Sequence, residues 1–208
     1  MKIGIIGSGH IGGTLTRRLR TLGHDVTVAN SRGPQSLADL AAETGATAGT
    51  LEEAVQGAEL VVIAIPLRAV PELPAALFDG KLVVDADNYY PERDGDIPEL
   101  LDRSLSSSRW TADHLKGARV VKVFNNIQAA YLMDRGQPAG TQDRIGLPVA
   151  ADDADAKRLV MELVDELGFD PVDAGTLDES WRQQPGTPVY GTDRDADGVR
   201  QGLAAARP

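Results

Sequence analysis

Residues 2–12 read KIGIIGSGHIG, and this stretch decides the fold. Lys2–Ile6 is a short, apolar and largely β-branched run, as a buried strand is. The glycine pattern G-x-G-x-x-G follows it directly at Gly7–Gly12, where a helical pattern begins. A glycine pattern between a strand and a helix is typical of the phosphate-binding turn in a Rossmann βαβ unit. The stretch therefore predicts a dinucleotide-binding fold.

Each glycine of this turn has a predicted role. Gly7 permits a tight turn, Gly9 lets the backbone approach a pyrophosphate, and Gly12 lets helix and strand pack closely. The helix start adds free N–H groups and a positive dipole end. A merely structural glycine turn is the alternative. We expect every residue of the turn to lie at the cofactor, with His10 as a neighbouring side chain and not a catalytic group: Gly7, Ser8, Gly9, His10, Ile11 and Gly12.

The end of the second strand indicates which dinucleotide binds. NAD-specific sites carry Asp or Glu there, which accepts hydrogen bonds from the ribose 2′-hydroxyl. Here Asp25–Ala29 is followed by Asn30, Ser31 and Arg32, and Asp25 lies at the opposite end of the strand. A guanidinium and a hydroxyl suit a 2′-phosphate, although a solvated surface arginine is the alternative. The sequence favours NADP(H), bound here by Asn30, Ser31 and Arg32.

Short apolar runs alternate with helical patterns along the chain, which indicates an α/β fold with a doubly wound, mainly parallel sheet. We expect a Rossmann domain over residues 1–124 and a small α/β extension over residues 125–208 that closes the acceptor site. The expected strands are Lys2–Ile6, Asp25–Ala29, Ala46–Ala48, Leu60–Ile65, Lys81–Asp85, Arg119–Phe124, Arg144–Ala150 and Asp170–Asp173. The expected helices are His10–Leu22, Ser36–Glu43, Leu51–Gln56, Val70–Leu77, Ile127–Asp134 and Ala154–Leu167, with a mildly helical excursion at Ser104–His114.

Further candidate residues follow other strands of the predicted sheet. Ligands of doubly wound sheets lie beyond the carboxyl ends of the strands. Ala64, Ile65 and Pro66 are expected under the ribose and nicotinamide, with Asn88 and Asn125 at the nicotinamide end. Because Asn favours caps and turns in any protein, ordinary turn chemistry is the alternative for both asparagines.

Composition excludes several classes of function. The net charge of −10 makes nucleic-acid binding improbable, since an acidic surface repels phosphate backbones. The absence of cysteine removes disulfides, thiol catalysis and thiolate metal sites, and we expect no metal site. The longest apolar run, Leu60–Leu67, is far below the ~18 residues of a membrane span, and the amino terminus lacks a signal-peptide pattern. These features favour a soluble, cytoplasmic protein without a membrane partner.

The side chains available suit hydride transfer between planar rings. Alcohol dehydrogenation moves a proton as well as a hydride and needs a positioned acid or base. A Tyr-x-x-x-Lys pair is absent, because Tyr89, Tyr131 and Tyr190 are each followed four residues later by Arg. We therefore expect no catalytic side chain, and a reaction in which the cofactors carry the chemistry.

Five segments of the chain resemble the family of NADP oxidoreductases that depend on the deazaflavin coenzyme F-420. They are Gly7–Gly12, Asn30–Arg32, Ile63–Pro66, Val120–Asn125 and Asp173–Gly175. The segment Val121–Asn125 is also similar to the cytoplasmic reductase domains of membrane metalloreductases, which use NADPH and a flavin. The resemblance implies a Rossmann domain whose carboxy-terminal part closes a ring-binding pocket over the nicotinamide, with Asn125 near the acceptor ring.

These observations lead to a hypothesis of an NADP(H)-dependent oxidoreductase with a deazaflavin or flavin as the second ring substrate. One rival is an NADPH:flavin or quinone-type reductase that does not use the deazaflavin, and another is a non-catalytic NADP(H)-binding sensor. The Pro/Gly-rich tail after Asp178 is expected as a loop across the site or onto a partner chain. Because Gln184–Tyr190 has little apolar content, docking on a second subunit would order it, and we expect a homodimer.

Overall fold

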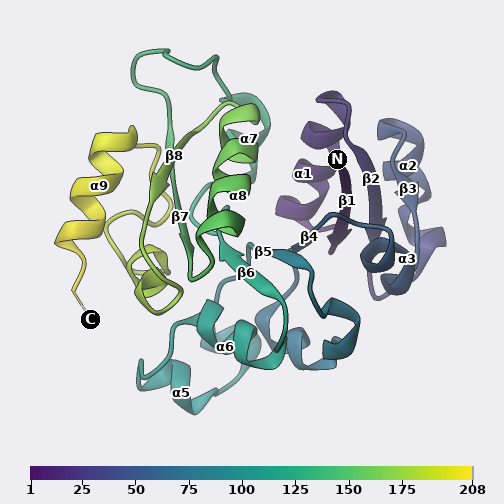
Figure 1. The fold of residues 1–208 in the computed structure, drawn as a ribbon, viewed down its shortest axis with the longest axis horizontal. Coiled ribbons are helices and arrows are strands. Elements are labelled where there is room, and N and C mark those ends of the chain that lie inside the picture. The colour runs from purple at the N-terminus through teal and green to yellow at the C-terminus, as the bar shows by residue number, and fades with distance from the viewer. Residues whose placement is uncertain (208) are drawn as a thin grey trace.

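An eight-stranded sheet forms the centre of the computed structural model, which describes residues 1–207. Its strands lie in the order β3-β2-β1-β4-β5-β6-β7-β8, and every neighbouring pair is parallel except β6 and β7. In Figure 1 this order runs from β3 on the right to β8 on the left. The strands are β1 (Lys2–Ile6), β2 (Asp25–Ala29), β3 (Thr47–Ala48), β4 (Leu60–Ile63), β5 (Leu82–Asp85), β6 (Arg119–Lys122), β7 (Gly146–Ala151) and β8 (Asp170–Asp173).

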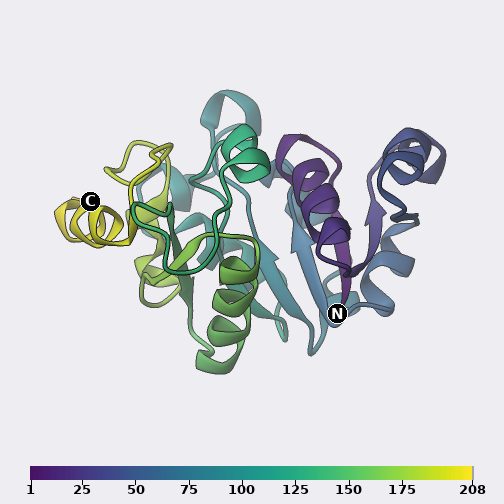
Figure 2. The same cartoon turned by 90° about the horizontal axis from the view of Figure 1, so that it is seen from above.

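The strand order confirms the predicted doubly wound, mainly parallel fold. The chain starts in the middle of the sheet at β1, winds outward to β3, and returns to place β4 on the other side of β1. This reversal creates a switch point between β1 and β4, where the loops at the strand ends diverge and leave a crevice. In Figure 2 the carboxy-terminal helix lies at the opposite end of the molecule from the elements around β3.

Helices cover both faces of the sheet because the strands are apolar on both sides. In β4, Leu60 and Val62 join one core cluster, whereas Val61 and Ile63 join a second one on the other face. Helices α1, α7 and α8 pack into the first cluster, and α3 and α6 into the second. The α-helices are α1 (His10–Thr21), α2 (Ala38–Thr44), α3 (Leu51–Gln56), α4 (Pro91–Asp94), α5 (Pro98–Leu101), α6 (Ser107–His114), α7 (Ala129–Asp134), α8 (Ala154–Glu166) and α9 (Ala196–Ala205).

Several predicted elements differ from the observed ones in length or type. The helix predicted at Val70–Leu77 is instead two 3₁₀ turns, Leu67–Glu72 and Ala75–Phe78. Pro71 and Pro74 explain the difference, since neither can donate the backbone hydrogen bond that a continuous helix requires. The predicted helix Ser36–Glu43 likewise divides into a 3₁₀ turn, Pro34–Leu37, and α2.

Two predicted strands end earlier than expected. β4 ends at Ile63 and not at Ile65, and β6 ends at Lys122 and not at Phe124. Phe124 has a positive φ of 65°, which is unusual for a bulky residue and turns the chain out of the strand direction. The residues just beyond β4 and β6 are therefore loop residues at the carboxyl edge of the sheet.

The tail after Asp178 contains structure that sequence analysis missed. A 3₁₀ turn covers Asp178–Gln183, and α9 is a helix of 10 residues. Asp195 caps α9, since its side chain accepts a hydrogen bond from the backbone N–H of Gly198 at 2.8 Å. Because α9 packs on β7 and β8 through Val199 and Leu203, it belongs to the folded body.

The sheet continues across the domain boundary predicted at residue 124. β7 pairs with β6 in the antiparallel direction, with Val121 opposite Ala151, and β8 pairs with β7 in parallel. The largest core cluster contains side chains from both sides of this boundary, among them Val121 and Leu147. No helix within residues 1–207 combines the length and the apolar character needed to cross a lipid bilayer.

Candidate functional site

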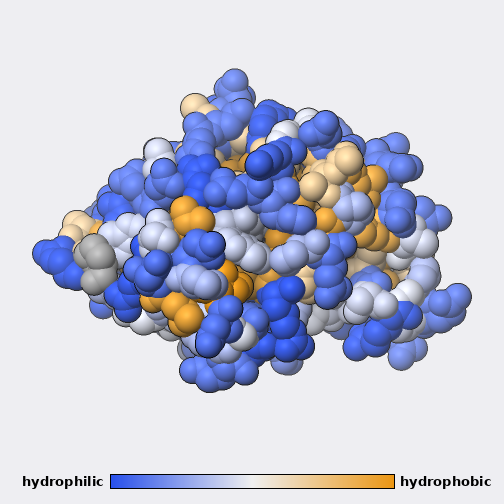
Figure 3. Space-filling model, turned by 90° about the horizontal axis from the view of Figure 1, so that it is seen from below, coloured by the Kyte–Doolittle hydropathy of each residue, from blue (hydrophilic) through white to orange (hydrophobic). Residues whose placement is uncertain are grey.

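A cavity of about 460 Å³ lies at the switch point between β1 and β4. We call it the strand-end cavity. Figure 3 views the molecule from below, and apolar side chains (orange) gather between polar ones on the right. Residues from the ends of β1, β2 and β4 line this cavity together with residues that follow them. They are Ile6, Gly7, Ser8, Gly9, Ala29, Asn30, Ser31, Arg32, Leu51, Ala64, Ile65, Pro66, Ala69, Glu72 and Leu73.

The three glycines of the first turn differ in what surrounds them. Gly7 has a φ of 106°, and a Cβ there would lie 2.1 Å from the carbonyl oxygen of Ala64. A Cβ at Gly12 would lie 1.9 Å from the carbonyl oxygen of Gly7. Protein packing alone thus requires glycine at both positions.

Gly9 is different, because apart from its chain neighbours Ser8 and His10 no atom of residues 1–207 lies within 4 Å of a Cβ built there. Its φ of −72° and ψ of −164° are also accessible to other residues. Gly9 is the N-cap of α1 and offers no side chain to the first N–H groups of that helix. An open space at a helix start with free N–H groups is a suitable place for an anionic group. Packing therefore leaves glycine unexplained at this position, whereas a ligand explains it.

Asn30 connects the first turn to the loop after β2. Its Nδ2 donates hydrogen bonds to Oγ of Ser8 at 3.0 Å and to Oγ of Ser36 at 2.9 Å. Its Oδ1 accepts the backbone N–H of Arg32 at 2.9 Å. The loop that carries Ser31 and Arg32 is thereby fixed beside the phosphate turn. Asn30 lines the cavity and also positions its neighbours.

Arg32 is the cationic residue in the lining of the strand-end cavity. It is exposed, and its guanidinium makes neither an ion pair nor a hydrogen bond within residues 1–207. The lining contains one carboxylate, Glu72, which comes from the segment after β4 and not from the end of β2. The geometry thus places an unpaired guanidinium beside the end of β2, where an NAD-specific site has an acid.

The structure brings together nine of the fourteen predicted cofactor residues in the lining of this cavity. His10, Ile11 and Gly12 lie in the first turn of α1 and are not part of the lining. The remaining two, Asn88 and Asn125, form a separate pair beyond β5 and β6. Contacts of all fourteen with a ligand stay predictions.

Asn125 is held by the protein itself. Its Nδ2 donates to Oδ1 of Asn88 at 3.1 Å and to the carbonyl oxygen of Gln183 at 2.8 Å. Its Oδ1 accepts Nε2 of Gln183 at 2.9 Å. Both amide hydrogens of Asn125 are thus used. Within residues 1–207, half-buried Asn88 donates only to the carbonyl oxygen of Asn125, at 2.8 Å, which leaves one of its amide hydrogens unused there. Of the pair, Asn88 is the better placed to contact a ligand.

The carboxy-terminal tail reaches the same strand ends. Gln183 contacts Asn125, and the hydroxyl of Tyr190 forms a short hydrogen bond with that of Tyr90. Val189 is fully buried. The segment Gln184–Tyr190 is thus ordered on its own chain, so a second subunit is not needed to order it. A homodimer stays a prediction.

A buried ionic cluster lies next to these strand ends, and sequence analysis missed it. Nζ of Lys122 lies 3.3 Å from Oδ2 of Asp85 and also donates to the backbone oxygen of Asp87. Ser108 donates to the same Asp85 oxygen at 2.7 Å. Asp87 accepts the backbone N–H of Ile65 through Oδ1 at 2.8 Å, but its Oδ2 is buried without a partner. Asp85, Asp87, Lys122 and Ser108 are all buried.

The environment of Asp87 favours its neutral form. Burial raises the pKa of the Asp87 carboxyl well above its usual value, and the neighbouring Asp85 carboxylate raises it further. The opposing effects of Lys122, the Ile65 N–H and Arg93 on this pKa are smaller. Because Lys122 is one cation between two carboxylates, it compensates only one of them.

Asp87→Asn should therefore become more stable relative to the wild type as the pH rises. The folded wild type keeps the Asp87 proton above pH 3.8, where the unfolded chain has lost it, so its stability falls by up to about 1.4 kcal/mol per pH unit. Asn keeps an acceptor for Ile65 and has no proton to lose. Urea unfolding of both proteins from about pH 4 to pH 7 measures the difference. A difference that does not change with pH contradicts the neutral carboxyl.

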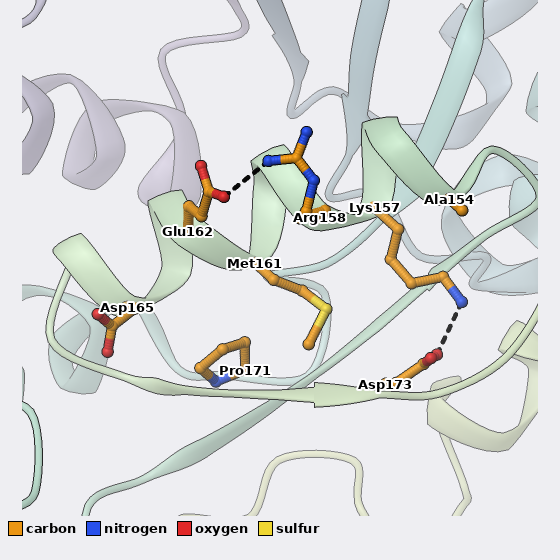
Figure 4. A pocket seen from close by; sticks show the side chains of 8 residues that line it. All are labelled: Ala154, Lys157, Arg158, Met161, Glu162, Asp165, Pro171 and Asp173. Atoms are coloured by element: carbon orange, nitrogen blue, oxygen red, sulfur yellow. Dashed lines mark hydrogen bonds and ion pairs between the residues drawn. The ribbon is translucent and has the colours of Figure 1, made fainter.

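A second hollow, of about 410 Å³, lies between α8 and β8 (Figure 4). Its charged side chains are paired within the chain: Lys157 contacts Asp173 at 2.7 Å, and Arg158 contacts Glu162 at 2.9 Å. Asp165, also in the lining, pairs with Arg144 at 2.6 Å. This groove therefore offers no unpaired charge to a ligand. Within residues 1–207, no cluster of three or more His, Asp or Glu side chains is arranged to hold a metal ion.

A doubly wound sheet with a glycine turn at its switch point defines a dinucleotide-binding protein of the Rossmann class. Residues 2–89 match the family model described as NADP oxidoreductase, coenzyme F420-dependent. A hypothetical protein from Sinorhizobium meliloti, known from a crystal structure, has 33% sequence identity with this chain. The alignment covers 93% of this chain and 94% of that protein, with a TM-score of 0.80. The chain is thus similar to this family of NADP oxidoreductases over residues 2–89, and to the Sinorhizobium meliloti protein over nearly its whole length.

Two further relatives carry names that describe redox functions. A protein of Arthrobacter sp., named as an F420-dependent NADP-reductase, is 29% identical, with coverage of 88% of this chain and 87% of its own and a TM-score of 0.73. Metalloreductase STEAP3 of Rattus norvegicus is 31% identical over 179 residues, or 85% of this chain and 34% of the metalloreductase. The chain spans less than half the length of the curated relatives it matches. The resemblance predicted from the sequence is thus confirmed.

Proposed function

We propose that this chain is an NADP(H)-dependent oxidoreductase that transfers a hydride between NADP(H) and a planar ring acceptor, a deazaflavin or a flavin. The observation that carries the proposal is the open space at Gly9, at the start of α1 and inside the strand-end cavity. The unpaired guanidinium of Arg32 in the same cavity supports a cofactor with a 2′-phosphate.

Different residues of the strand-end cavity would bind successive parts of NADP(H). Gly9 and the first N–H groups of α1 would bind the pyrophosphate. Ser31 and Arg32 would bind the 2′-phosphate, held in place by Asn30. The apolar side chains of Leu51 and Leu73 would face the adenine. The nicotinamide would then extend past Ile65 and Pro66 toward the ends of β5 and β6, which we call the acceptor end.

Hydride transfer between two rings makes modest demands on the protein. The bound nicotinamide supplies or takes up the hydride. The protein must hold two rings in contact and in the right orientation, which accounts for most of the rate. Asn88, fixed by Asn125 and by Arg93, whose guanidinium donates to its backbone oxygen at 2.6 Å, would orient the nicotinamide. Tyr90 and Tyr190 are half-buried and would border the second ring.

The purified chain should oxidise NADPH when a deazaflavin coenzyme or a free flavin is supplied. It should not oxidise secondary alcohols or hydroxy acids with NADP, since such reactions need a positioned acid or base at the substrate. Loss of NADPH absorbance with each acceptor measures the activity. Asp197→Asn, on the exposed side of α9, is the matched control that should behave like the wild type.

The same experiment separates the rival functions. Activity with free flavin or a quinone but not with the deazaflavin favours a flavin or quinone-type reductase. If NADPH binds tightly and none of these acceptors removes its hydride, the catalytic proposal is wrong and an NADP(H)-binding sensor replaces it.

A further inference from the structure

The buried ionic cluster touches the wall of the strand-end cavity. Oδ1 of Asp87 accepts the backbone N–H of Ile65, and Ile65 lines the cavity. The residue after Asp87 is Asn88, the amide that faces the acceptor end. The carboxyl of Asp87 is therefore one hydrogen bond away from the cavity wall and one residue away from the acceptor end.

Every element packed around Asp87 contributes to its electrostatic environment. Asp85 lies two residues earlier at the end of β5, and its Oδ1 accepts the backbone N–H of Asp87 at 2.9 Å. Lys122 approaches from β6, and Arg93 from α4. Ser108 of α6 donates to Asp85 and not to Asp87. Arg93 is itself paired with the buried carboxylate of Asp94 at 2.8 Å. The charges of Asp85, Lys122, Arg93 and Asp94 thus sum to zero, and loss of the Asp87 proton adds one negative charge.

Contacts among residues 1–207 account for only one of the two carboxyl oxygens of Asp87, because Oδ1 accepts the N–H of Ile65 and Oδ2 has no partner there. A buried oxygen without a hydrogen-bond partner costs stability, and a second buried carboxylate beside one lysine costs more. An asparagine would satisfy Ile65 equally well without the charge. A carboxyl kept in such a place is typical of a site where its ionisation is used.

We propose that Asp87 is a positioning residue of the nicotinamide end, whose ionisation sets the relative affinity of the chain for NADP⁺ and NADPH. This inference rests on the proposed function. The oxidised nicotinamide ring carries a positive charge that the reduced ring lacks. An ionised Asp87 therefore stabilises bound NADP⁺ over bound NADPH, whereas a neutral Asp87 does not distinguish them by charge.

The effect has a measurable size. A unit charge acting across ~12 Å at an effective dielectric constant of ~20 changes an affinity about tenfold. By linkage, bound NADP⁺ lowers the pKa of Asp87 to the same extent, so NADP⁺ binding releases more protons than NADPH binding. The 2′-phosphate titrates in both cofactors and cancels from the ratio of their dissociation constants.

Two measurements test the proposal. The first is the ratio of the dissociation constants for NADPH and NADP⁺, determined by fluorescence titration and competition from about pH 5.5 to pH 9. In the wild type and in Asp197→Asn, NADP⁺ should gain up to about tenfold on NADPH as the pH rises. In Asp87→Asn the ratio should stay constant.

The second measurement uses the wild type alone, so it does not depend on the folding of a variant. Calorimetry in two buffers of different ionisation enthalpy should show more proton release for NADP⁺ than for NADPH. Three results would overturn the proposal. The ratio of the two dissociation constants could be independent of pH in the wild type, or it could depend on pH in Asp87→Asn as it does in the wild type. NADP⁺ and NADPH could also release equal numbers of protons on binding. If the wild type binds neither cofactor at any pH, the proposed function is wrong and this inference falls with it.

Discussion

Gly9→Val is expected to abolish NADPH binding while leaving the protein folded. The valine side chain would enter the open space at the start of α1, which the pyrophosphate would otherwise occupy. Apart from its chain neighbours Ser8 and His10, no atom of residues 1–207 lies within 4 Å of a Cβ at this position, so we expect the chain to accept a side chain there. We expect the affinity for NADPH to fall by more than about a hundredfold, or roughly 2.7 kcal/mol. Fluorescence titration measures binding, and thermal unfolding followed by circular dichroism checks the fold.

Gly57→Ala is the matched control for this variant. Gly57 ends α3 with a φ of −78°, and a Cβ there would meet its nearest neighbour at an ordinary 3.7 Å. It does not belong to the lining of the strand-end cavity. The control should bind NADPH like the wild type. Normal NADPH binding by folded Gly9→Val would instead show that the turn is structural only.

Arg32→Ala should weaken NADPH binding by about ten- to a hundredfold and leave NADH binding nearly unchanged. A hydrogen bond between charged groups contributes roughly 1.5–3 kcal/mol, which corresponds to this range. NADH lacks the 2′-phosphate and therefore loses nothing. Since the chain carries a net charge of −10, few other cations can replace the missing one. Titration of both cofactors against the wild type and the variant measures the selectivity.

Arg200→Ala, which removes an exposed arginine of α9 paired with Asp197, controls for the change in net charge. It should bind both cofactors like the wild type. Equal losses for NADPH and NADH in Arg32→Ala would contradict the assignment of Arg32 to the 2′-phosphate.

Local patterns made the dinucleotide half predictable from the sequence. β1, β2 and α3 have the expected bounds, because each is encoded by a short contiguous signal such as the run Lys2–Ile6. The glycine turn and Asn30–Arg32 could also be predicted as candidates, because each directly follows a strand. The structure brings these segments together around the strand-end cavity.

The acceptor end was less predictable because its contacts join distant parts of the chain. Gln183 lies 58 residues from Asn125, and no local motif marks it as a partner. Lys122 and Asp85 are 37 residues apart and each looks like an ordinary strand residue. Lys122 and Asp85 become buried only through the pairing of β5 with β6 and the packing of α6 against these strands. Sequence analysis therefore did not predict the buried ionic cluster of Asp85, Asp87 and Lys122.

The bonds that link Tyr90 to Tyr190 across 100 residues, and Asn125 to Gln183, have a consequence for biosynthesis. A chain emerging from the ribosome presents its glycine turn and Arg32 long before Gln183 and Tyr190 exist. Amino-terminal parts of a protein generally begin to fold first during synthesis. The nascent chain thus contains the glycine turn and Arg32 while Gln183 and Tyr190, which contact the proposed acceptor end, have not yet been translated.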